Sequence, residues 1–156
     1  MSLTAKQSDV ALEKRRLRLW IRMLRTTRYV ETQVREMLRD KYETTLPRFD
    51  VMAALYRAKS KLKMSVLSKQ LLVSNGNVTG IVDRLVADGM VIRVAVENDR
   101  RAMPVSLTTE GRMLFERMAG DHEDLVSQLF SKLEHHDLDM MADVFSRLKE
   151  EEELSS

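Results

Sequence analysis

Residues 74–87 hold small polar side chains in a spacing that could hydrogen-bond to another surface. Val78, Val82 and Leu85 recur at helical spacing, so they share one face, which must be buried. The opposite face and its flanks carry small or polar residues, namely Ser74, Asn75, Gly76, Asn77, Thr79, Gly80 and Arg84. Ser, Thr and Asn can hydrogen-bond base edges or phosphates in a DNA major groove, which admits a helix. The pattern favours a DNA-reading helix, and an ordinary solvated face is the simpler alternative.

Two glycines on this face cost helix stability, roughly 1 kcal/mol each relative to alanine. The presence of Gly76 and Gly80 on this face therefore requires a physical explanation. Close approach of the helix backbone to another surface is one such reason.

A second group of candidate residues lies in a turn, Asn98-Asp99-Arg100-Arg101, between two alternating apolar runs. Arginines at a hairpin tip suit the narrow, negative minor groove of DNA, and Asp99 could orient one guanidinium through a bidentate pair. Solvated turn charges are the alternative interpretation of Arg100 and Arg101. Outside this turn, Lys63, Lys69 and Arg84 would add salt-dependent attraction to phosphates.

The helices that position these groups have local signals at their ends. Ser65 can cap a short helix that carries Leu67 and Leu71. Gly89 suits the left-handed end of the helix that follows. Thr108 can cap a further helix, which the apolar spacing extends to about Leu133, and a last helix is expected at about His136–Glu153.

The runs on either side of the turn alternate as strands with one buried face should. The first run sets Ile92, Val94 and Val96 against Val91, Arg93 and Ala95, and the second sets Met103, Val105 and Leu107 on one face. Pro104 cannot donate to a ladder, so the second strand is expected at the edge of its sheet.

A long helix is expected from about Asp9 to Asp40, because apolar residues recur at helical spacing without Pro or Gly. It is longer than a small core can cover, so its surplus apolar surface implies a partner. It also carries a dense group of cations: Lys14, Arg15, Arg16, Arg18, Arg22, Arg25 and Arg28. These either pair with acidic residues of another helix or form an anion site beside Trp20.

The next helix begins after Leu46-Pro47, where proline suits a first turn, and Phe49 and Met52 on it are typical core residues. The junction of this helix with the basic one could instead hold a planar organic acid. The candidate ligand residues are Arg16, Trp20, Arg28, Arg48, Phe49 and Met52.

The run LLVSNGNVTGIVDRLVADGMVIR, followed by NDRRAMPVSLTTEG, resembles the core of the MarR family of transcriptional regulators. The resemblance covers about Leu46 to Phe115. Its DxR wing corresponds to Asp99, Arg100 and Arg101, and its LTxxG to Leu107, Thr108 and Gly111.

The resemblance implies a dimer whose recognition helix enters the major groove and whose wing arginine, here Arg101, enters the minor groove. It also implies an effector pocket between the dimer helices and the reading domain, and the stretch RLWIRMLRTTRYVE with TLPRFDVMAALYR resembles members that respond to aromatic acids or their coenzyme A thioesters. Many members carry a basic residue after the helix threonine. Here Gly80 follows Thr79, which puts one base or phosphate contact in doubt.

Composition limits the classes of protein that remain. The chain has 156 residues, 44% of them hydrophobic, and no cysteine, which excludes disulfides and thiolate metal sites. The net charge is +2, but residues 1–60 hold 14 Lys and Arg against 7 Asp and Glu, whereas residues 110–156 hold 5 against 13. The chain has no long apolar run and no signal-peptide pattern, so a cytoplasmic protein with no membrane partner is expected.

An enzyme is not expected, because the sequence contains no phosphate loop, nucleophile elbow or Cys–His pair. A group of histidines and acids has no ligand spacing typical of a metal site, so neither a metal nor a cofactor is predicted. Its members are His122, Glu123, His135, His136, Asp137 and Asp139.

These observations predict a mainly α fold, a winged helix-turn-helix of order α-α-α-α-β-β-α-α with long terminal helices at a two-fold dimer interface. Residues 1–156 form one MarR-like domain, with DNA binding at 46–111 and dimerisation at 1–45 and 112–156. The predicted function is that of a homodimeric regulator, by default a repressor, of pseudo-palindromic double-stranded operator DNA, released by a small anionic ligand of the aromatic acid or aryl-CoA type. A winged helix used for protein or RNA contacts, without a ligand response, is the alternative.

Overall fold

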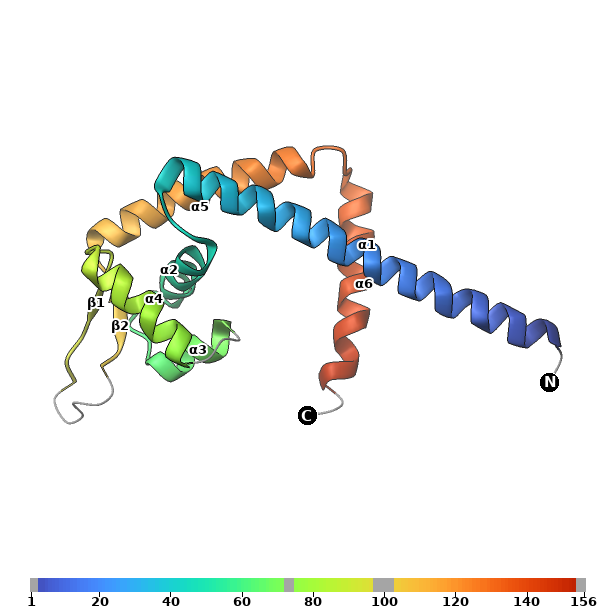
Figure 1. Cartoon of the computed structure of the whole chain (residues 1–156), viewed down its shortest axis with the longest axis horizontal. Helices are drawn as coiled ribbons and strands as arrows, with labels where there is room; N and C mark the ends of the chain where they lie inside the picture. Colours follow the sequence, from blue (N-terminus) through green and yellow to red (C-terminus); the bar gives the residue numbers. More distant parts are fainter. Residues whose placement is uncertain (1–2, 72–74, 97–102, 154–156) are drawn as a thin grey trace. The chain divides into compact units, whose positions relative to one another are not determined.

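The computed structural model describes residues 3–71, 75–96 and 103–153 (Figure 1). Along the described chain the elements are α1 (Leu3–Tyr42), α2 (Leu46–Ala58), α3 (Met64–Leu71), α4 (Asn75–Ala87), β1 (Val91–Arg93), β2 (Val105–Leu107), α5 (Thr109–Leu129) and α6 (His135–Glu153). This order confirms the predicted mainly α, winged helix-turn-helix fold.

Helix α2 forms the centre of the core. Residues Val51 to Leu55 are all buried, so this helix is enclosed on every side rather than along one stripe. Leu67 of α3 and Val82 of α4 are buried with it, and α2, α3 and α4 all contact one another. Thr45 caps α2 by accepting a hydrogen bond from the Arg48 N–H at 3.4 Å.

The strands form a two-stranded antiparallel sheet in which Val91 pairs with Leu107 and Arg93 with Val105. The buried face of β1 begins with Val91, whereas Ile92 is exposed. The pattern of alternation was therefore predicted, but the face that starts with Ile92 is the outer one. Strand β1 also ends at Arg93, before the predicted run ends at residue 96.

Two further predictions, one about a helix start and one about strand pairing, are wrong. Helix α3 begins at Met64, so Ser65 lies inside the helix rather than at its cap. The second strand is not a simple edge strand, because Val105 also bridges Leu62 through hydrogen bonds of 2.8 and 2.9 Å. Pro104 lies just before the strand, where its missing N–H leaves no gap in the ladder.

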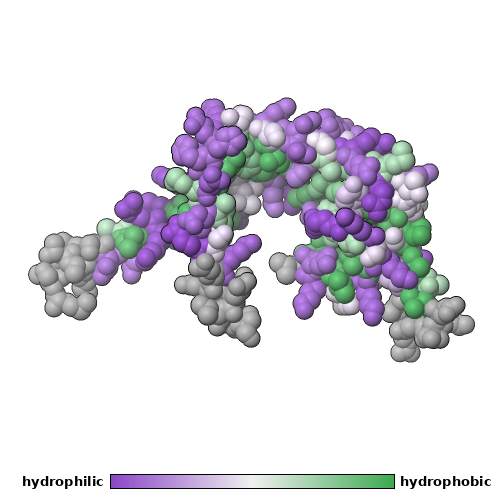
Figure 2. All heavy atoms as spheres, turned by 180° about the vertical axis from the view of Figure 1, so that it is seen from behind, coloured by the Kyte–Doolittle hydropathy of each residue, from purple (hydrophilic) through white to green (hydrophobic). Residues whose placement is uncertain are grey.

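Helix α1 has 40 residues and starts before the predicted Asp9. From residue 9 onward, where burial is described, only Val34 and Leu38 are buried. Large apolar side chains are exposed along the rest of the helix, including Leu17 and Trp20. Figure 2 likewise shows hydrophobic side chains at the surface among the hydrophilic ones.

The C-terminal end of α1 is held to α5 by a partly buried polar contact. The Tyr42 hydroxyl donates to Asp121 Oδ2 at 2.6 Å, and Lys41 Nζ lies 3.2 Å from the same oxygen. The hydrogen bonds from Tyr42 and Lys41 lower the pKa of Asp121. Burial, reinforced by the carboxylate of Asp121, raises the pKa of Tyr42.

The chain divides after His122 into two compact units, and the second contains the end of α5 and all of α6. Helix α6 begins at His135 and exposes a row of apolar side chains, namely Leu138, Met140, Met141, Phe145 and Leu148. In the part of the chain that is described, no helix combines the length and apolarity needed to cross a bilayer.

Candidate nucleic-acid interface

Helix α4 presents the polar face that its sequence predicts. Val78, Val82 and Leu85 are buried, and their burial against the core fixes the rotation of the helix about its axis. The opposite side is therefore turned to solvent. It carries the exposed residues Asn77, Thr79, Gly80, Asp83 and Arg84.

Gly80 is not required by the packing of the chain. A Cβ built at this position meets nothing within 4 Å, so alanine would fit and would favour the helix. The packing of one chain therefore gives no reason for glycine on this face. An approaching external surface remains the explanation that the sequence suggested.

A joint between α4 and the wing was not predicted from the sequence. Arg93 of β1 forms an ion pair with Asp83 of α4. The pair crosses from the exposed helix face to the first wing strand, and the Arg93 side chain is only 26% exposed. The one available signal was an acid on a polar helix face ten residues before an arginine in a strand, and this signal is weak. The ion pair neutralises a carboxylate that would otherwise repel phosphates.

The end of α4 and the base of the wing are held by backbone contacts. Gly89 has a φ of 76°, as predicted for a left-handed cap, and the Met90 N–H donates to Leu85 O at 2.9 Å. The Thr108 N–H then donates to Met90 O at 3.0 Å, and its hydroxyl donates to Gly89 O at 2.7 Å. These bonds tie the start of β1 to the start of α5.

The LTxxG pattern has a clear structural role in this joint. The Gly111 N–H donates to Thr108 Oγ1 at 2.9 Å, which confirms Thr108 as the helix cap. A Cβ on Gly111 would lie 1.9 Å from Met90 O, so only glycine lets α5 start against this carbonyl.

The other predicted DNA-binding residues fall into three groups. Asn75 and Gly76 begin α4. Lys63 precedes α3 and Lys69 lies in its last turn, and both are exposed. Ser74, Asp99, Arg100 and Arg101 lie outside the described residues.

The predicted ligand residues lie on two helices. Arg16, Trp20 and Arg28 lie exposed on α1. Arg48 is half-buried, and Phe49 and Met52 are buried on α2. Trp20 precedes the buried Val34 by 14 residues of α1, which is about 21 Å of helix.

An aromatic cluster joins α2 to α5 at the buried end of this set. The ring centroids of Phe49 and Phe115 are 5.4 Å apart, and Tyr56 lies 4.8 Å from Phe115. The Tyr56 hydroxyl donates to Glu116 at 3.0 Å, and the Arg112 guanidinium lies 4.9 Å from the Tyr56 ring. Phe49 thus has a packing role on α5, and a ligand role for it stays a prediction.

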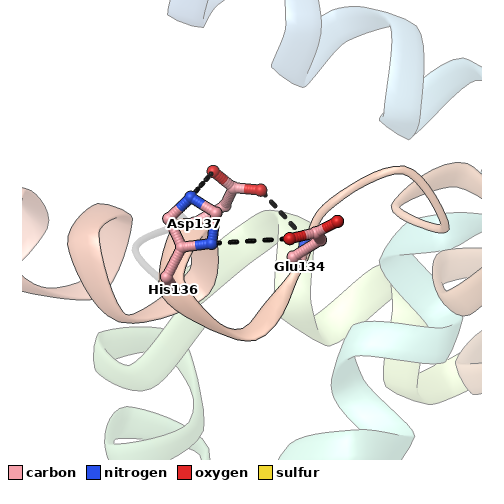
Figure 3. A network of polar contacts seen from close by, with 3 residues as sticks. All are labelled: Glu134, His136 and Asp137. Carbon is pink, nitrogen blue, oxygen red and sulfur yellow. Dashed lines mark hydrogen bonds and ion pairs between the residues drawn. The ribbon is translucent and has the colours of Figure 1, made fainter.

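The histidines near α6 do not converge on one point. His136 lies between two carboxylates, with Nε2 3.2 Å from Asp137 and Nδ1 3.7 Å from Glu134, on opposite sides of its ring (Figure 3). The Glu134 N–H donates to Asp137 at 2.9 Å, which closes the first turn of the helix. Among the described residues no three His, Cys, Asp or Glu side chains could share a metal ion.

Comparisons with known proteins point to one family. A model described as MarR family matches residues 42–102. The transcriptional repressor YetL of Bacillus subtilis is 30% identical over 106 residues, which are 65% of this chain and 64% of YetL. A MarR family transcriptional regulator from Silicibacter pomeroyi has the same fold, with a TM-score of 0.75 at 29% identity over 89% of this chain and 96% of that one. These matches support a winged-helix regulator of the MarR family.

A member of the MarR family was crystallised with its target. It is a mutant of MarR from E. coli in complex with operator DNA. The match covers 82% of this chain and 94% of the E. coli chain, with a TM-score of 0.68 at 26% identity. Three curated relatives are 30% to 39% identical to this chain over the aligned residues. The chain spans between 44% and 64% of their length.

Proposed function

We propose that this protein is a transcriptional regulator of the MarR family that binds double-stranded operator DNA, and that it acts in the cytoplasm. The observation that carries the proposal is the outward face of α4, where buried Val78 and Val82 turn Asn77, Thr79 and Gly80 to solvent. Asn and Thr supply base contacts, while Arg84 with Lys63 and Lys69 supplies phosphate contacts. The operator complex of E. coli MarR supports this assignment by analogy.

The proposed working form is a two-fold dimer. The exposed apolar side chains of α1 and α6, such as Trp20 and Phe145, require cover that one chain does not supply. A two-fold axis would present two α4 helices to successive major grooves of a pseudo-palindromic site, about one helical turn apart. Arg100 and Arg101 would reach the adjacent minor groove.

The proposed regulation is release of DNA by a small anionic ligand, of the aromatic acid or aryl-CoA type. Such a ligand would bind near Trp20, Arg16 and Arg28, and would favour a dimer whose two α4 helices are wrongly spaced for DNA. Repression relieved by the ligand is the default direction, in line with the name of YetL. Because Trp20 is the single tryptophan and is exposed, its fluorescence reports on binding. No response to aromatic acids or their coenzyme A esters would contradict this part of the proposal.

DNA binding is tested with a matched pair of charge substitutions. Gly80 and Gly120 both lie in helices, and an added Cβ meets nothing within 4 Å at either position. Gly80→Glu and Gly120→Glu therefore change the net charge equally, at two positions where the added Cβ has open space. We expect Gly80→Glu to weaken binding to DNA fragments selected by the wild-type protein at least tenfold, because it places a carboxylate against phosphates. Gly120→Glu should bind like wild type.

The opposite change at the same position gives a second measurement. Gly80→Arg should tighten binding and steepen the dependence of log K on log salt by about 0.9, the value of one added phosphate contact. Equal affinities of wild type, Gly80→Glu and Gly80→Arg for duplex DNA would reject α4 as the reading helix. Tighter binding of RNA than of duplex DNA by wild type would favour the RNA-binding alternative.

A further inference from the structure

Five cations form a continuous stripe along the first half of α1. At 100° per residue, Lys14, Arg15, Arg18, Arg22 and Arg25 fall within about 100° of one another around the helix axis. We refer to these five residues as the basic stripe. All five side chains are exposed, and none forms an ion pair with any residue that the structure describes.

The basic stripe lies opposite the face of α1 that packs. Val34 and Leu38, the buried residues of α1 from residue 9 onward, point about 170° away from the centre of the stripe. The same opposite side carries Trp20 in the exposed half of the helix, while Leu19 lies at its flank, about 90° from the centre of the stripe. Any apolar surface that covers this half would therefore leave the basic stripe in solvent.

Ion pairing with the acidic last helix does not account for the stripe. On α6 the exposed apolar residues Leu138, Met141 and Phe145 share one face, while Asp139 lies about 130° and Asp143 about 170° from its centre. If α1 and α6 of two copies meet through their apolar faces, their charges point to opposite sides. Asp143 is in any case paired with Arg147 on its own helix, at 3.2 Å.

The arrangement of the stripe matches a linear polyanion rather than a single small anion. Its five charges span 11 residue steps, about 16 Å of helix, so successive charges lie about 4 Å apart along the axis. One strand of duplex DNA carries one phosphate per about 3.4 Å of axis. Four of the five cations are arginines, whose planar guanidinium binds phosphate through two hydrogen bonds. Side chains of Arg15, Arg18 and Arg22 also line an open hollow of about 500 Å³, together with Leu12, Arg16 and Leu19.

We propose that the basic stripe is a second DNA-binding surface, separate from α4 and the wing, that holds the phosphate backbone without reading sequence. The inference rests on the proposed function, since it assumes that the protein meets duplex DNA. The stripe does not include Arg16 and Arg28, the arginines assigned above to the ligand, but Arg16 lines the same hollow as three stripe residues.

The test compares two triple variants that remove the same charge. Arg18→Gln, Arg22→Gln and Arg25→Gln together neutralise most of the stripe, and glutamine keeps the helix propensity of arginine. The control combines Lys132→Gln, Arg147→Gln and Lys149→Gln, three exposed cations at the other end of the chain. The probe is a random-sequence duplex longer than two helical turns, followed by fluorescence anisotropy over a series of salt concentrations. Sedimentation first establishes concentrations at which all proteins have one oligomeric state.

We expect the slope of log K against log salt to fall by about 2.7 in the stripe variant, which is 0.9 for each of three lost contacts. The control should keep the wild-type slope. A wild-type slope in the stripe variant, or an equal fall in the control, would overturn the inference. A stripe variant that dissociates into monomers, with an unchanged slope of log K against log salt, would also overturn the inference. The stripe would then be a contact between subunits. If wild type binds no duplex, the proposed function fails as well. If Gly80→Glu loses DNA while the stripe variant does not change, this inference fails alone.

Discussion

Replacement of Gly111 by alanine tests how the wing is attached to α5. An alanine Cβ would lie 1.9 Å from Met90 O and 2.8 Å from Met90 C, whereas ordinary contacts begin at 3.4 Å. Both obstructing atoms belong to the backbone, so no side chain can turn aside. The start of α5 would have to retreat by about 1.5 Å, the difference between these distances.

The cost follows from what that retreat disrupts. Overpacking a tight contact typically costs about 1 to 3 kcal/mol. The Thr108 N–H bond to Met90 O, now 3.0 Å, would also be lost, which costs about 1 kcal/mol more. Alanine returns up to about 1 kcal/mol through its helix propensity. We therefore expect Gly111→Ala to destabilise the fold by about 1 to 3 kcal/mol.

Gly120→Ala is the matched control, because Gly120 lies in the same helix and its Cβ would meet nothing within 4 Å. It should stabilise the protein by up to about 1 kcal/mol. Urea unfolding of both variants measures the difference, at one protein concentration, because the stability of a dimer depends on concentration. Equal stability of Gly111→Ala and Gly120→Ala would show that the Met90 contact is not as close as described.

Three further predictions concern single contacts. A double-mutant cycle with Asp83→Asn and Arg93→Gln should give a coupling of about 1 kcal/mol or less, because the Asp83 side chain is 61% exposed; zero coupling would remove the pair as a joint of the wing. Ser68→Ala should stabilise the protein by roughly 1 kcal/mol, since the buried Ser68 Oγ has no hydrogen-bond partner in the described structure; a loss of stability would reveal a partner. The folded-state pKa of Asp121 is lowered, so its stabilising effect is present above the ordinary value of 3.8 and is lost as the pH falls through the folded value. Acid unfolding should therefore be less steep below that pH for Asp121→Asn, and identical profiles would contradict the contact with Tyr42.

Local signals predicted the reading helix well because each depends on a few neighbouring residues. The spacing of Val78, Val82 and Leu85 set the buried face of α4, and every described residue on the opposite face is exposed as expected. Gly89 ends that helix with a positive φ, and Thr108 caps the next one. Helical periodicity and capping are short-range properties, so one sequence is enough to recognise them.

The contacts between elements were not predictable in the same way. The ion pair of Asp83 with Arg93 requires α4 and β1 to meet at one angle, and that angle is set by packing. The bridge from Leu62 to Val105 joins segments more than 40 residues apart. Because Pro104 carries no information about so distant a segment, the prediction that the second strand lies at the edge of the sheet was wrong. The alternation around Ile92 could not say which of its two faces would meet the core.

The amino-acid sequence alone thus determined the order of the elements, the rotation of α4 and the likeness to the MarR family, because periodicity, caps and motif spacing are written in adjacent residues. The tertiary structure decided which strand face is buried, why Gly111 must be glycine, and that Phe49 packs on Phe115 of α5 while Trp20 is exposed. These three features depend on distances between segments that are far apart in the chain. Such distances are fixed only when the elements pack together around α2.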